Sequence, residues 1–320
     1  MSAAAAAKPK KKTSAVTLAH RAEFYAMRAT IKALSALSWD RAVSIGENLG
    51  QLGYKPLGIR KRVVERQIAA AFPELSPEAV KDLARESYRH LGRSSIETAL
   101  LAFIGKEGLL KLVETVEGWE IVDRQLSRGK GFLLVSGHMG NWELGGAYIA
   151  ARGVPLDAIV RGMANPLFDA WLNKGRGELG ITVIHDSEAV RRTPRSLRAG
   201  RAVGFIADQG VLGLASTFVP FFGRPAKTPR GAAVFALRFE VPVIFVVAVR
   251  KPNGRFRIVF ERVEIAGTGD RDKDVDAIVA KYTQLLEKWV RVAPEQYFWQ
   301  HRRWKRQPPN TPPELRDPSA

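Results

Sequence analysis

Short apolar runs alternate with helical patterns between residues 113 and 292, and this alternation restricts the possible folds more than any other feature of the sequence. Apolar runs separated by segments of helical periodicity predict βα units, whose strands form a largely parallel sheet. We therefore expect an α/β fold in which helices flank a central, largely parallel or mixed sheet. The predicted strands span residues 113–116, 131–135, 156–160, 182–184, 202–207, 243–249 and 255–260. The predicted helices span residues 120–126, 141–151, 166–178, 187–198, 229–239 and 274–292.

The segment ahead of this alternation, residues 18–112, has a helical pattern and predicts an all-α N-terminal segment. Its first part, residues 18–39, has the pattern of a basic amphipathic helix. The residues that make this pattern are Phe24, Met27, Ile31 and Leu34, with Arg21, Arg28 and Lys32 among them. Such a helix can lie in a membrane interface or pack its apolar stripe on the rest of the fold, and the residues leave both open.

Charge and composition narrow the possible partners. The chain has 320 residues, with 50 Lys and Arg against 32 Asp and Glu, so its formal net charge is +18. This excess favours an anionic partner: nucleic acid, an anionic membrane surface, a phosphorylated lipid or an acidic carrier protein. Because the chain has no cysteine, disulfides, cysteine-ligated metal sites and thiol catalysis are excluded. No stretch reaches the roughly 18 uncharged apolar residues of a spanning helix, so we expect no membrane span.

Both ends of the chain have the composition of disordered tails. Residues 1–17 combine a run of alanines with a cluster of lysines, and they lack the apolar centre of a secretion signal. Residues 307–320 are rich in proline and polar residues. We expect a disordered basic tail at 1–17 and a disordered tail at 307–320.

A histidine and a glutamate lie where a predicted strand turns into a predicted helix. His138 is in the turn, between Gly137 and Gly140, and Glu143 is in the first helical turn. On one continuous helix, a spacing of five would separate the two side chains around the axis. With the turn, the imidazole and the carboxylate can converge on a pocket and transfer protons. The alternative is a helix-capping His138 beside a solvated Glu143, and the spacing alone does not decide.

Polar residues also follow other predicted strands. Arg161 and Asn165 come after the strand at 156–160, and Arg176 lies on the next helix. Asp208 and Gln209 follow the strand at 202–207. Because the carboxyl ends of parallel strands meet at one edge of a sheet, we expect these side chains to lie near His138. Guanidinium groups suit phosphate or a developing oxyanion, whereas the alternatives are solvated arginines and an Asp208 that caps its own turn.

Two further segments combine aromatic and apolar residues. We interpret residues 211–230 as a long apolar loop that lines an acyl-chain groove, touches a bilayer or plugs the core, with Phe218, Phe221 and Phe222 as its main side chains. Residues 297–306 interleave tryptophans with basic residues, among them Trp299, Arg302, Arg303 and Trp304. Such a cluster can stack nucleic-acid bases or hold lipid head groups at a membrane surface. We expect the lipid contact.

Several ordered motifs resemble one enzyme family. They are Gly-His-Met-Gly-Asn-Trp-Glu at 137–143, Ala-Asp-Gln at 207–209, Phe-Phe-Gly at 221–223 and Trp-x-His-x-Arg-Trp-Lys at 299–305. Together they resemble the lipid A biosynthesis acyltransferases, the lauroyl and myristoyl transferases of the lysophospholipid acyltransferase superfamily, over about residues 72–305. The resemblance implies a glycerolphosphate-acyltransferase-like fold at 113–306 and a membrane-associating region at 18–112. It also implies that His138 is the general base, that Glu143 orients it, and that Arg161, Asn165, Arg176, Asp208 and Gln209 border the cleft.

The resemblance implies a reaction as well as a fold. A fatty acyl group would pass from acyl carrier protein or acyl-CoA to a hydroxyl of an anionic glycolipid, for which we expect a lipid A precursor. No cofactor and no metal would be needed, and the enzyme would sit on the cytoplasmic face of the bacterial inner membrane. No Gly-x-Ser-x-Gly elbow is present, so direct transfer is the simplest chemistry. The alternatives are a phosphatidylinositol mannoside or an aminolipid acceptor and, in a different class, a basic nucleic-acid-binding protein, although no nucleic-acid motif is present.

Overall fold

A seven-stranded sheet forms the centre of the computed structural model, which describes residues 16–210, 213–265 and 267–320. Its order is β1-β9-β8-β2-β5-β3-β4. The antiparallel pair β8–β9 divides the sheet into two groups of parallel strands, so the predicted mixed α/β sheet is confirmed. The strands are β1 (Val113–Glu117), β2 (Phe132–Ser136), β3 (Leu156–Val160), β4 (Ile181–His185), β5 (Ala202–Ile206), β8 (Val243–Arg250) and β9 (Phe256–Val263).

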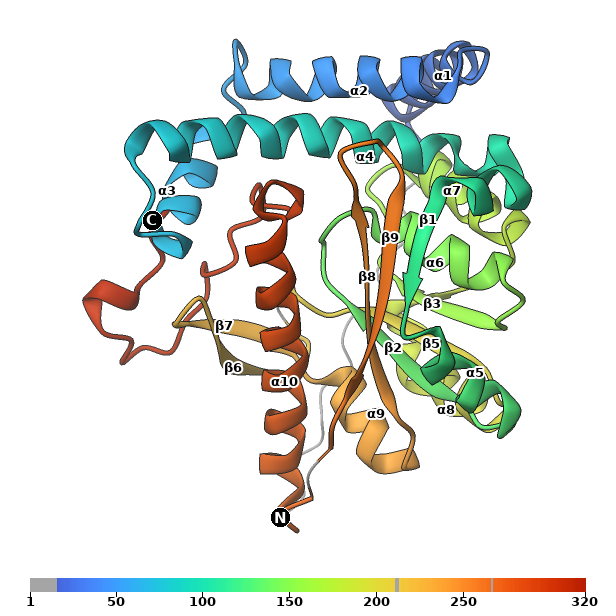
Figure 1. Cartoon of the computed structure of the whole chain (residues 1–320), viewed down its shortest axis with the longest axis vertical. Coiled ribbons are helices and arrows are strands. Elements are labelled where there is room, and N and C mark those ends of the chain that lie inside the picture. The colour runs from blue at the N-terminus through green and yellow to red at the C-terminus, as the bar shows by residue number, and fades with distance from the viewer. Residues whose placement is uncertain (1–15, 211–212, 266) are drawn as a thin grey trace.

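Helices cover both faces of this sheet (Figure 1). They are α5 (Trp119–Ser127), α6 (Trp142–Ala151), α7 (Pro166–Glu178), α8 (Ala189–Arg198), α9 (Gly231–Phe239) and α10 (Arg271–Val292). Because strand side chains alternate between faces, Leu133 and Val135 of β2 join a core with α9 and α10. Phe132 and Leu134 point the other way, into a core with α5 and α6. All five residues of β2 are buried, which is why the strand could be predicted from its composition.

Four helices form the N-terminal region, and they confirm the predicted all-α segment. They are α1 (Leu18–Ser35), α2 (Trp39–Tyr54), α3 (Lys61–Ala71) and α4 (Pro77–Leu112). Helix α2 lies against the long helix α4 (Figure 1). Glycines permit this close approach, since a Cβ built on Gly50 would lie 2.1 Å from the Tyr88 carbonyl oxygen. Helix α4 in turn packs on α6, so the helical region contacts the α/β part of the molecule.

The apolar segment predicted as a long loop is a β-hairpin instead. Strands β6 (Ser216–Phe221) and β7 (Arg224–Pro229) pair antiparallel beside α10. Phe222 and Gly223 form the turn, both with positive φ. The alternation of buried and exposed residues along β6 explains the apolar composition. Residues 211 and 212 of the predicted loop lie outside the described residues.

The two predicted tails have different outcomes. Most of the basic tail, residues 1–15, lies outside the described residues, and Thr17 caps α1. Residues 307–320, where we expected disorder, pack against the hairpin. Arg224 donates hydrogen bonds to the carbonyl oxygens of Glu314 and Arg316, and Thr311 is buried. Within the described parts of the chain, no helix is long and apolar enough to cross a bilayer.

Candidate active site

The loop between β2 and α6 presents His138 at the carboxyl edge of the sheet. Gly140 has φ +60°, and a Cβ there would lie 1.9 Å from the Ala248 carbonyl oxygen, so the tight turn needs glycine. Asn141 caps α6 by accepting a hydrogen bond from the Leu144 amide at 3.0 Å. The loop is also tied to the C-terminal segment, since the Phe298 amide donates to the His138 carbonyl oxygen.

Asp208 is the carboxylate that contacts the His138 imidazole. Its Oδ1 lies 2.6 Å from His138 Nδ1, and its Oδ2 accepts a hydrogen bond from the His138 backbone amide at 3.1 Å. The sheet produces this contact, because β2 and β5 are parallel neighbours and Ser136 pairs with Ile206. His138 and Asp208 each lie two residues beyond that pair. Two strands that are distant in sequence therefore bring a base and an acid together.

The contact with Asp208 determines which nitrogen of His138 faces the cleft. A carboxylate only accepts hydrogen bonds, so Nδ1 carries the proton and Nε2 keeps its lone pair. The Gln209 amide lies 3.2 Å from the same Nδ1, beside this bond. Trp142 and Phe298 flank the imidazole ring, and the side chain remains 23% exposed. A partly exposed imidazole with this hydrogen bond at Nδ1 has the chemistry of a general base.

The surroundings of Asp208 keep its carboxylate charged. Burial alone would raise the pKa of this carboxyl, but the charge and hydrogen bonds of His138, with the charge of Arg303, lower the pKa well below its ordinary value. Tyr297 lies on the other side, where burial and its interaction with Asp208 raise the pKa of the phenol well above 10. Sequence reasoning missed Tyr297 as a neighbour of the site. Its position just before the tryptophan-rich motif was the only signal.

Glu143 pairs with Arg176 of α7 and not with His138. Arg176 Nε donates to Glu143 Oε2 at 3.0 Å, and Arg176 Nη2 donates to Oε1 at 2.5 Å. The prediction that Glu143 holds the imidazole is therefore corrected: in the described structure Asp208 occupies Nδ1. The physical reason is that α6 directs the Glu143 side chain toward α7. The structure does bring Glu143 and Arg176 together at the cleft, as a bidentate ion pair.

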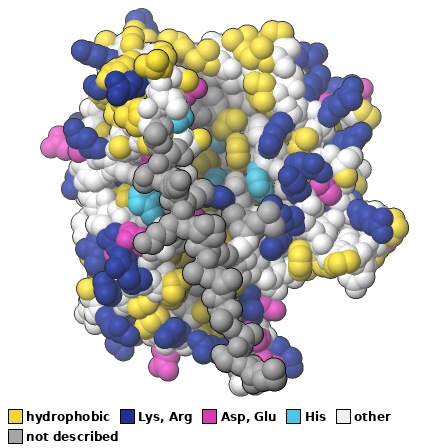
Figure 2. All heavy atoms as spheres, turned by 180° about the vertical axis from the view of Figure 1, so that it is seen from behind, with side chains coloured by type: hydrophobic (Ala, Val, Ile, Leu, Met, Phe, Trp, Pro, Cys, Tyr) yellow, Lys and Arg dark blue, Asp and Glu magenta, His cyan; other side chains and the backbone are white. Residues whose placement is uncertain are grey.

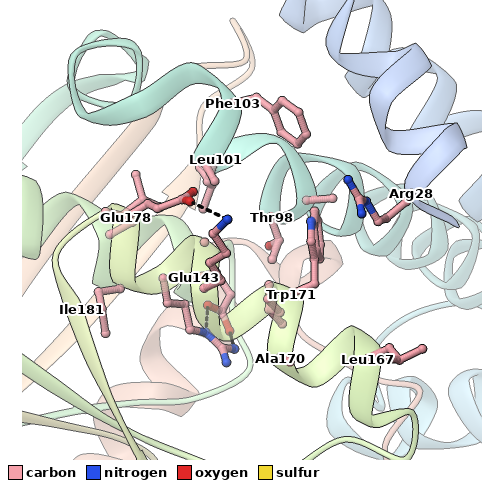
Figure 3. Close-up of a pocket in the computed structure, with 18 of the residues that line it drawn as sticks. Arg28, Thr98, Leu101, Phe103, Glu143, Leu167, Ala170, Trp171, Glu178 and Ile181 are labelled. Atoms are coloured by element: carbon pink, nitrogen blue, oxygen red, sulfur yellow. Dashed lines mark hydrogen bonds and ion pairs between the residues drawn. The ribbon is translucent and has the colours of Figure 1, made fainter. Parts of the chain in front are cut away.

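Two cavities meet at this ion pair. The larger, of about 450 Å³, lies between α1, α4, α6 and α7, and Figure 3 shows Glu143 on one side of it with Arg28 and Phe103 on the other. The smaller, of about 90 Å³, runs between the sheet and α6 and is lined mainly by apolar side chains such as Leu134, Ile149 and Val246. Glu143, Arg176 and Ile181 line both cavities. An apolar chain and a polar group can thus be accommodated side by side.

Arg161 and Asn165 have different positions. Arg161 follows β3 and is exposed. Asn165 caps α7 by accepting a hydrogen bond from the Leu167 amide, and its own amide donates to the His20 carbonyl oxygen of α1. The contacts of Asn165 are therefore structural ones that join α7 to the N-terminal region. Arg161 remains available to an anionic group at the carboxyl edge of the sheet.

The predicted acyl-groove phenylalanines are mostly core residues. Phe221 is fully buried and Phe222 nearly so, and both pack on one another and on the C-terminal aromatic residues. Neither ring lines the two cavities at the ion pair. The prediction of a groove or membrane contact is therefore wrong for these two residues, because strand alternation turns Phe221 inward. Phe218, on the opposite face of β6, is exposed.

The tryptophan and arginine cluster at the C-terminus is also internal. Trp299 and Trp304 are fully buried. Arg303 is buried too, and it donates to the Lys227 carbonyl oxygen and the Thr228 hydroxyl, each at 2.7 Å. Arg302 pairs with Asp317 at 2.6 Å. The predicted head-group or membrane contact is therefore corrected for the buried residues, which instead belong to a segment that contacts both the His138 loop and the hairpin. Nucleic-acid stacking is excluded for the two tryptophans for the same reason.

The fold and the site together define a class of protein: an α/β enzyme with a histidine–carboxylate base at the carboxyl edge of its sheet and an apolar cavity beside it. The chain belongs to the bacterial lipid A biosynthesis acyltransferases, since the model of that family matches residues 9–306. It is therefore an O-acyltransferase. The family predicted from the sequence motifs is confirmed.

Individual relatives agree with this assignment. The chain is 27% identical over 271 residues to the lipid A biosynthesis lauroyltransferase of Escherichia coli (strain K12), covering 84% of this chain and 86% of that protein. It is 28% identical over 265 residues to the palmitoleoyltransferase of the same strain, covering 82% and 85%. The myristoyltransferase of that strain is 23% identical over 257 residues, covering 80% and 77%. The named relatives differ in acyl group.

Proposed function

We propose that this enzyme transfers a fatty acyl group from a thioester donor to a hydroxyl of a lipid A precursor. Membership of the family and the names of the relatives support the acceptor. The single observation that carries the chemistry is the 2.6 Å contact between His138 Nδ1 and Asp208 Oδ1, with the imidazole partly open to the cleft. A phosphatidylinositol mannoside or an aminolipid would be the alternative acceptor.

His138 acts as general base in this proposal. Its Nε2 removes the proton of the acceptor hydroxyl, whose oxygen attacks the thioester carbonyl carbon. The tetrahedral intermediate collapses, the carbon–sulfur bond breaks, and the imidazolium returns the proton to the leaving thiolate. Asp208 holds the tautomer and stabilises the imidazolium. Acyl carrier protein or acyl-CoA would supply the thioester, and the protein would need no cofactor.

The cavities and arginines bind substrate in this proposal. The apolar cavity between the sheet and α6 accepts part of the acyl chain. Arg161 is free to bind phosphate, whereas Arg176 stays with Glu143 and fixes the wall between the two cavities. Helix dipoles and guanidinium groups at this edge favour an anionic acceptor.

We also propose that the enzyme associates peripherally with the cytoplasmic face of the inner membrane through its helical region. Ile45, Leu49 and Leu52 form an exposed apolar stripe along α2, with exposed Leu37 just before it. The buried face of α2 packs on α4, so this stripe is its outer face. Figure 2 shows hydrophobic side chains with Lys and Arg among them at the end of the molecule where α1 and α2 lie. Such a surface fits an anionic bilayer interface.

The reaction is tested by mass spectrometry of the lipid product after incubation with acyl donors and candidate glycolipids. We expect acylated lipid A precursor with the wild type and none with His138→Ala. His185→Ala is the matched control, because His185 also ends a strand at this edge and lies at the outer strand β4. Turnover by His138→Ala would overturn the proposed base, and product from only the alternative lipids would overturn the acceptor.

The membrane surface is tested by co-sedimentation with vesicles of zwitterionic and anionic lipid. Ile45→Glu with Leu49→Glu should reduce binding about tenfold or more, since the burial of two large side chains is lost. Val190→Glu is the control, because Val190 is also an exposed apolar residue, more exposed than Ile45 and Leu49, but lies on α8. If the α2 double variant and Val190→Glu bound vesicles equally well, α2 would not be part of the membrane-binding surface.

A further inference from the structure

A buried ion pair lies directly behind the catalytic loop. Glu97 of α4 has no exposed surface, and it pairs with Arg250 at the end of β8, whose side chain is 8% exposed. Asn141 lies with them and is also buried. Burial raises the pKa of the Glu97 carboxyl above its ordinary value, although the nearby Arg250 and the hydrogen bond from Asn141 oppose the shift. None of these charges takes part in the proton transfers described above.

The cluster is joined to the loop through Asn141. The Asn141 side-chain amide donates to Glu97 Oε2 at 2.9 Å, while its oxygen accepts from the Leu144 amide at the start of α6. One side chain therefore connects α4 to both the loop and the helix. Gly140 has two further contacts. Its carbonyl oxygen lies 3.2 Å from His90 Nε2, and its backbone amide donates a hydrogen bond to the Gln296 carbonyl oxygen. The loop that carries His138 is thus held from α4 and from the C-terminal segment.

Burial of this ion pair has a cost that its position explains. Removing two charges from water costs several kcal/mol per ion, and a well-packed apolar pair would often be as stable. Packing of α4 on the sheet therefore does not require charge here. What an apolar pair could not do is accept the Asn141 amide hydrogen bond. The charges are placed where a donor on the catalytic loop needs a buried acceptor.

We propose that Glu97 is a positioning residue: it fixes Asn141, and through it the His138 loop and the start of α6, in the geometry that the reaction needs. The inference rests on the proposed function of His138 for its effect on rate. A displacement of about 1 Å at a catalytic group can lower the rate by about 10²-fold. Arg250 offsets part of the cost of burying the Glu97 carboxyl, and it contacts the same oxygen, Oε2, that accepts the Asn141 hydrogen bond.

Glu97→Gln is the first test. We expect kcat to fall about 10- to 100-fold with KM within about threefold, because the loop shifts while the substrate cavities remain. Asp157→Asn is the control: the buried Asp157 carboxylate pairs with the partly exposed Arg201 at the opposite, amino-terminal edge of the sheet. It should lower the unfolding temperature and leave kcat unchanged.

Asn141→Ser is the second test, and it keeps the Glu97–Arg250 pair intact. Serine still caps α6 but is too short to reach Glu97, so only the connection is cut. We expect a similar loss of kcat and a smaller loss of stability than in Glu97→Gln, because the ion pair remains. This variant decides the matter if Glu97→Gln does not fold. The double variant Glu97→Gln with Asn141→Asp exchanges the two groups. The amide at position 97 can then donate a hydrogen bond to the carboxylate at position 141, which should restore part of the lost kcat.

A spectroscopic measurement separates this inference from the proposed function. The Nδ1–H proton of His138, which is donated to Asp208, gives a resonance in histidine-labelled protein whether or not lipid is acylated. Glu97→Gln and Asn141→Ser should shift or broaden it, and Asp157→Asn should not. An unchanged resonance with wild-type kcat in both loop variants overturns the inference. Failure of the wild type to acylate any glycolipid, with the resonance shifted as expected, overturns only the proposed function.

Discussion

Two carboxylates lie near His138, one in space and one in sequence, and their surroundings differ. Asp208 comes from the end of β5 and contacts His138 Nδ1, with Arg303 and Tyr297 behind it. Glu143 is only five residues from His138 in sequence, on α6, and its carboxylate is held by Arg176. The acid that is near in sequence thus pairs with an arginine, and the acid that is far in sequence contacts the imidazole, as the proposed mechanism requires. Asp208 reaches His138 because β5 and β2, which these two residues follow, are neighbouring strands.

Asp208→Asn should have the largest effect. An amide at this position can hold the wrong tautomer of His138 and cannot stabilise the imidazolium, so we expect kcat to fall about 10³- to 10⁴-fold. Acceptor binding should change little, because Asp208 is buried behind the imidazole. Steady-state kinetics with the glycolipid acceptor measure both quantities. A loss below tenfold would mean that Asp208 is not the orienting acid.

Glu143→Gln should have a smaller and different effect. It leaves Arg176 without its counter-charge in a site where both side chains are mostly buried, so we expect a loss of about 1–3 kcal/mol in the free energy of unfolding. The rate constant should fall about tenfold, through the shifted wall of the cavity. Denaturant unfolding and kinetics measure the two effects.

The double variant Glu143→Gln with Arg176→Met sharpens this test. Because it removes both charges, it should recover part of the lost stability. If Glu143→Gln alone lowered kcat as far as Asp208→Asn and left stability unchanged, the comparison between the two acids would be reversed.

The fold could largely be predicted from the sequence because it depends on local pattern. All five residues of β2 are apolar or small and buried, and a capping Asn165 with Pro166 marks the start of α7. Strand order could not be predicted, since β2 lies between β5 and β8, which come much later in the chain. The carboxylates and the base were therefore identified, but their pairing was not.

Composition did not predict the burial of residues 297–306, the C-terminal block, and the reason is physical. Tryptophan with arginine is favoured both at lipid surfaces and in cores where the guanidinium finds carbonyl oxygens. Arg303 finds them on the hairpin, at Lys227 and with the Thr228 hydroxyl. That hairpin was itself predicted as a loop. The burial of the C-terminal block could not be inferred from sequence, because it depends on the β6–β7 hairpin that packs against it.

The comparison extends to two histidines whose pKa is controlled mainly by burial, although the charge of Asp208 opposes the shift at His301. Burial lowers the pKa of His90 to about 3 and that of His301 to about 4, against an ordinary value of 6.5. Both stay neutral in the folded protein, whereas the unfolded chain takes up protons below pH 6.5. Stability should therefore be fully present above pH 6.5 and fall as the pH decreases toward 4, with a limiting slope of about 1.4 kcal/mol per pH unit for each group.

Unfolding by denaturant at a series of pH values measures this slope. His301→Gln should reduce it between pH 6.5 and 4, because glutamine does not titrate. His185→Gln, at the half-buried end of β4, is the control. An unchanged slope in His301→Gln would show that this imidazole is not kept neutral by burial.

Arg302→Gln should have the smallest effect, and it defines how far the surroundings of Asp208 extend. Arg303 is buried and lowers the pKa of Asp208, whereas its neighbour Arg302 pairs with Asp317 at a partly exposed position. Loss of a partly exposed ion pair costs about 1 kcal/mol or less. We expect kcat and binding to anionic vesicles to stay within twofold of wild type, since membrane contact is proposed for α2. Arg303→Met should lower kcat measurably, because it removes a cation that favours ionised Asp208. A vesicle-binding defect in Arg302→Gln would place the C-terminal block on the membrane side after all.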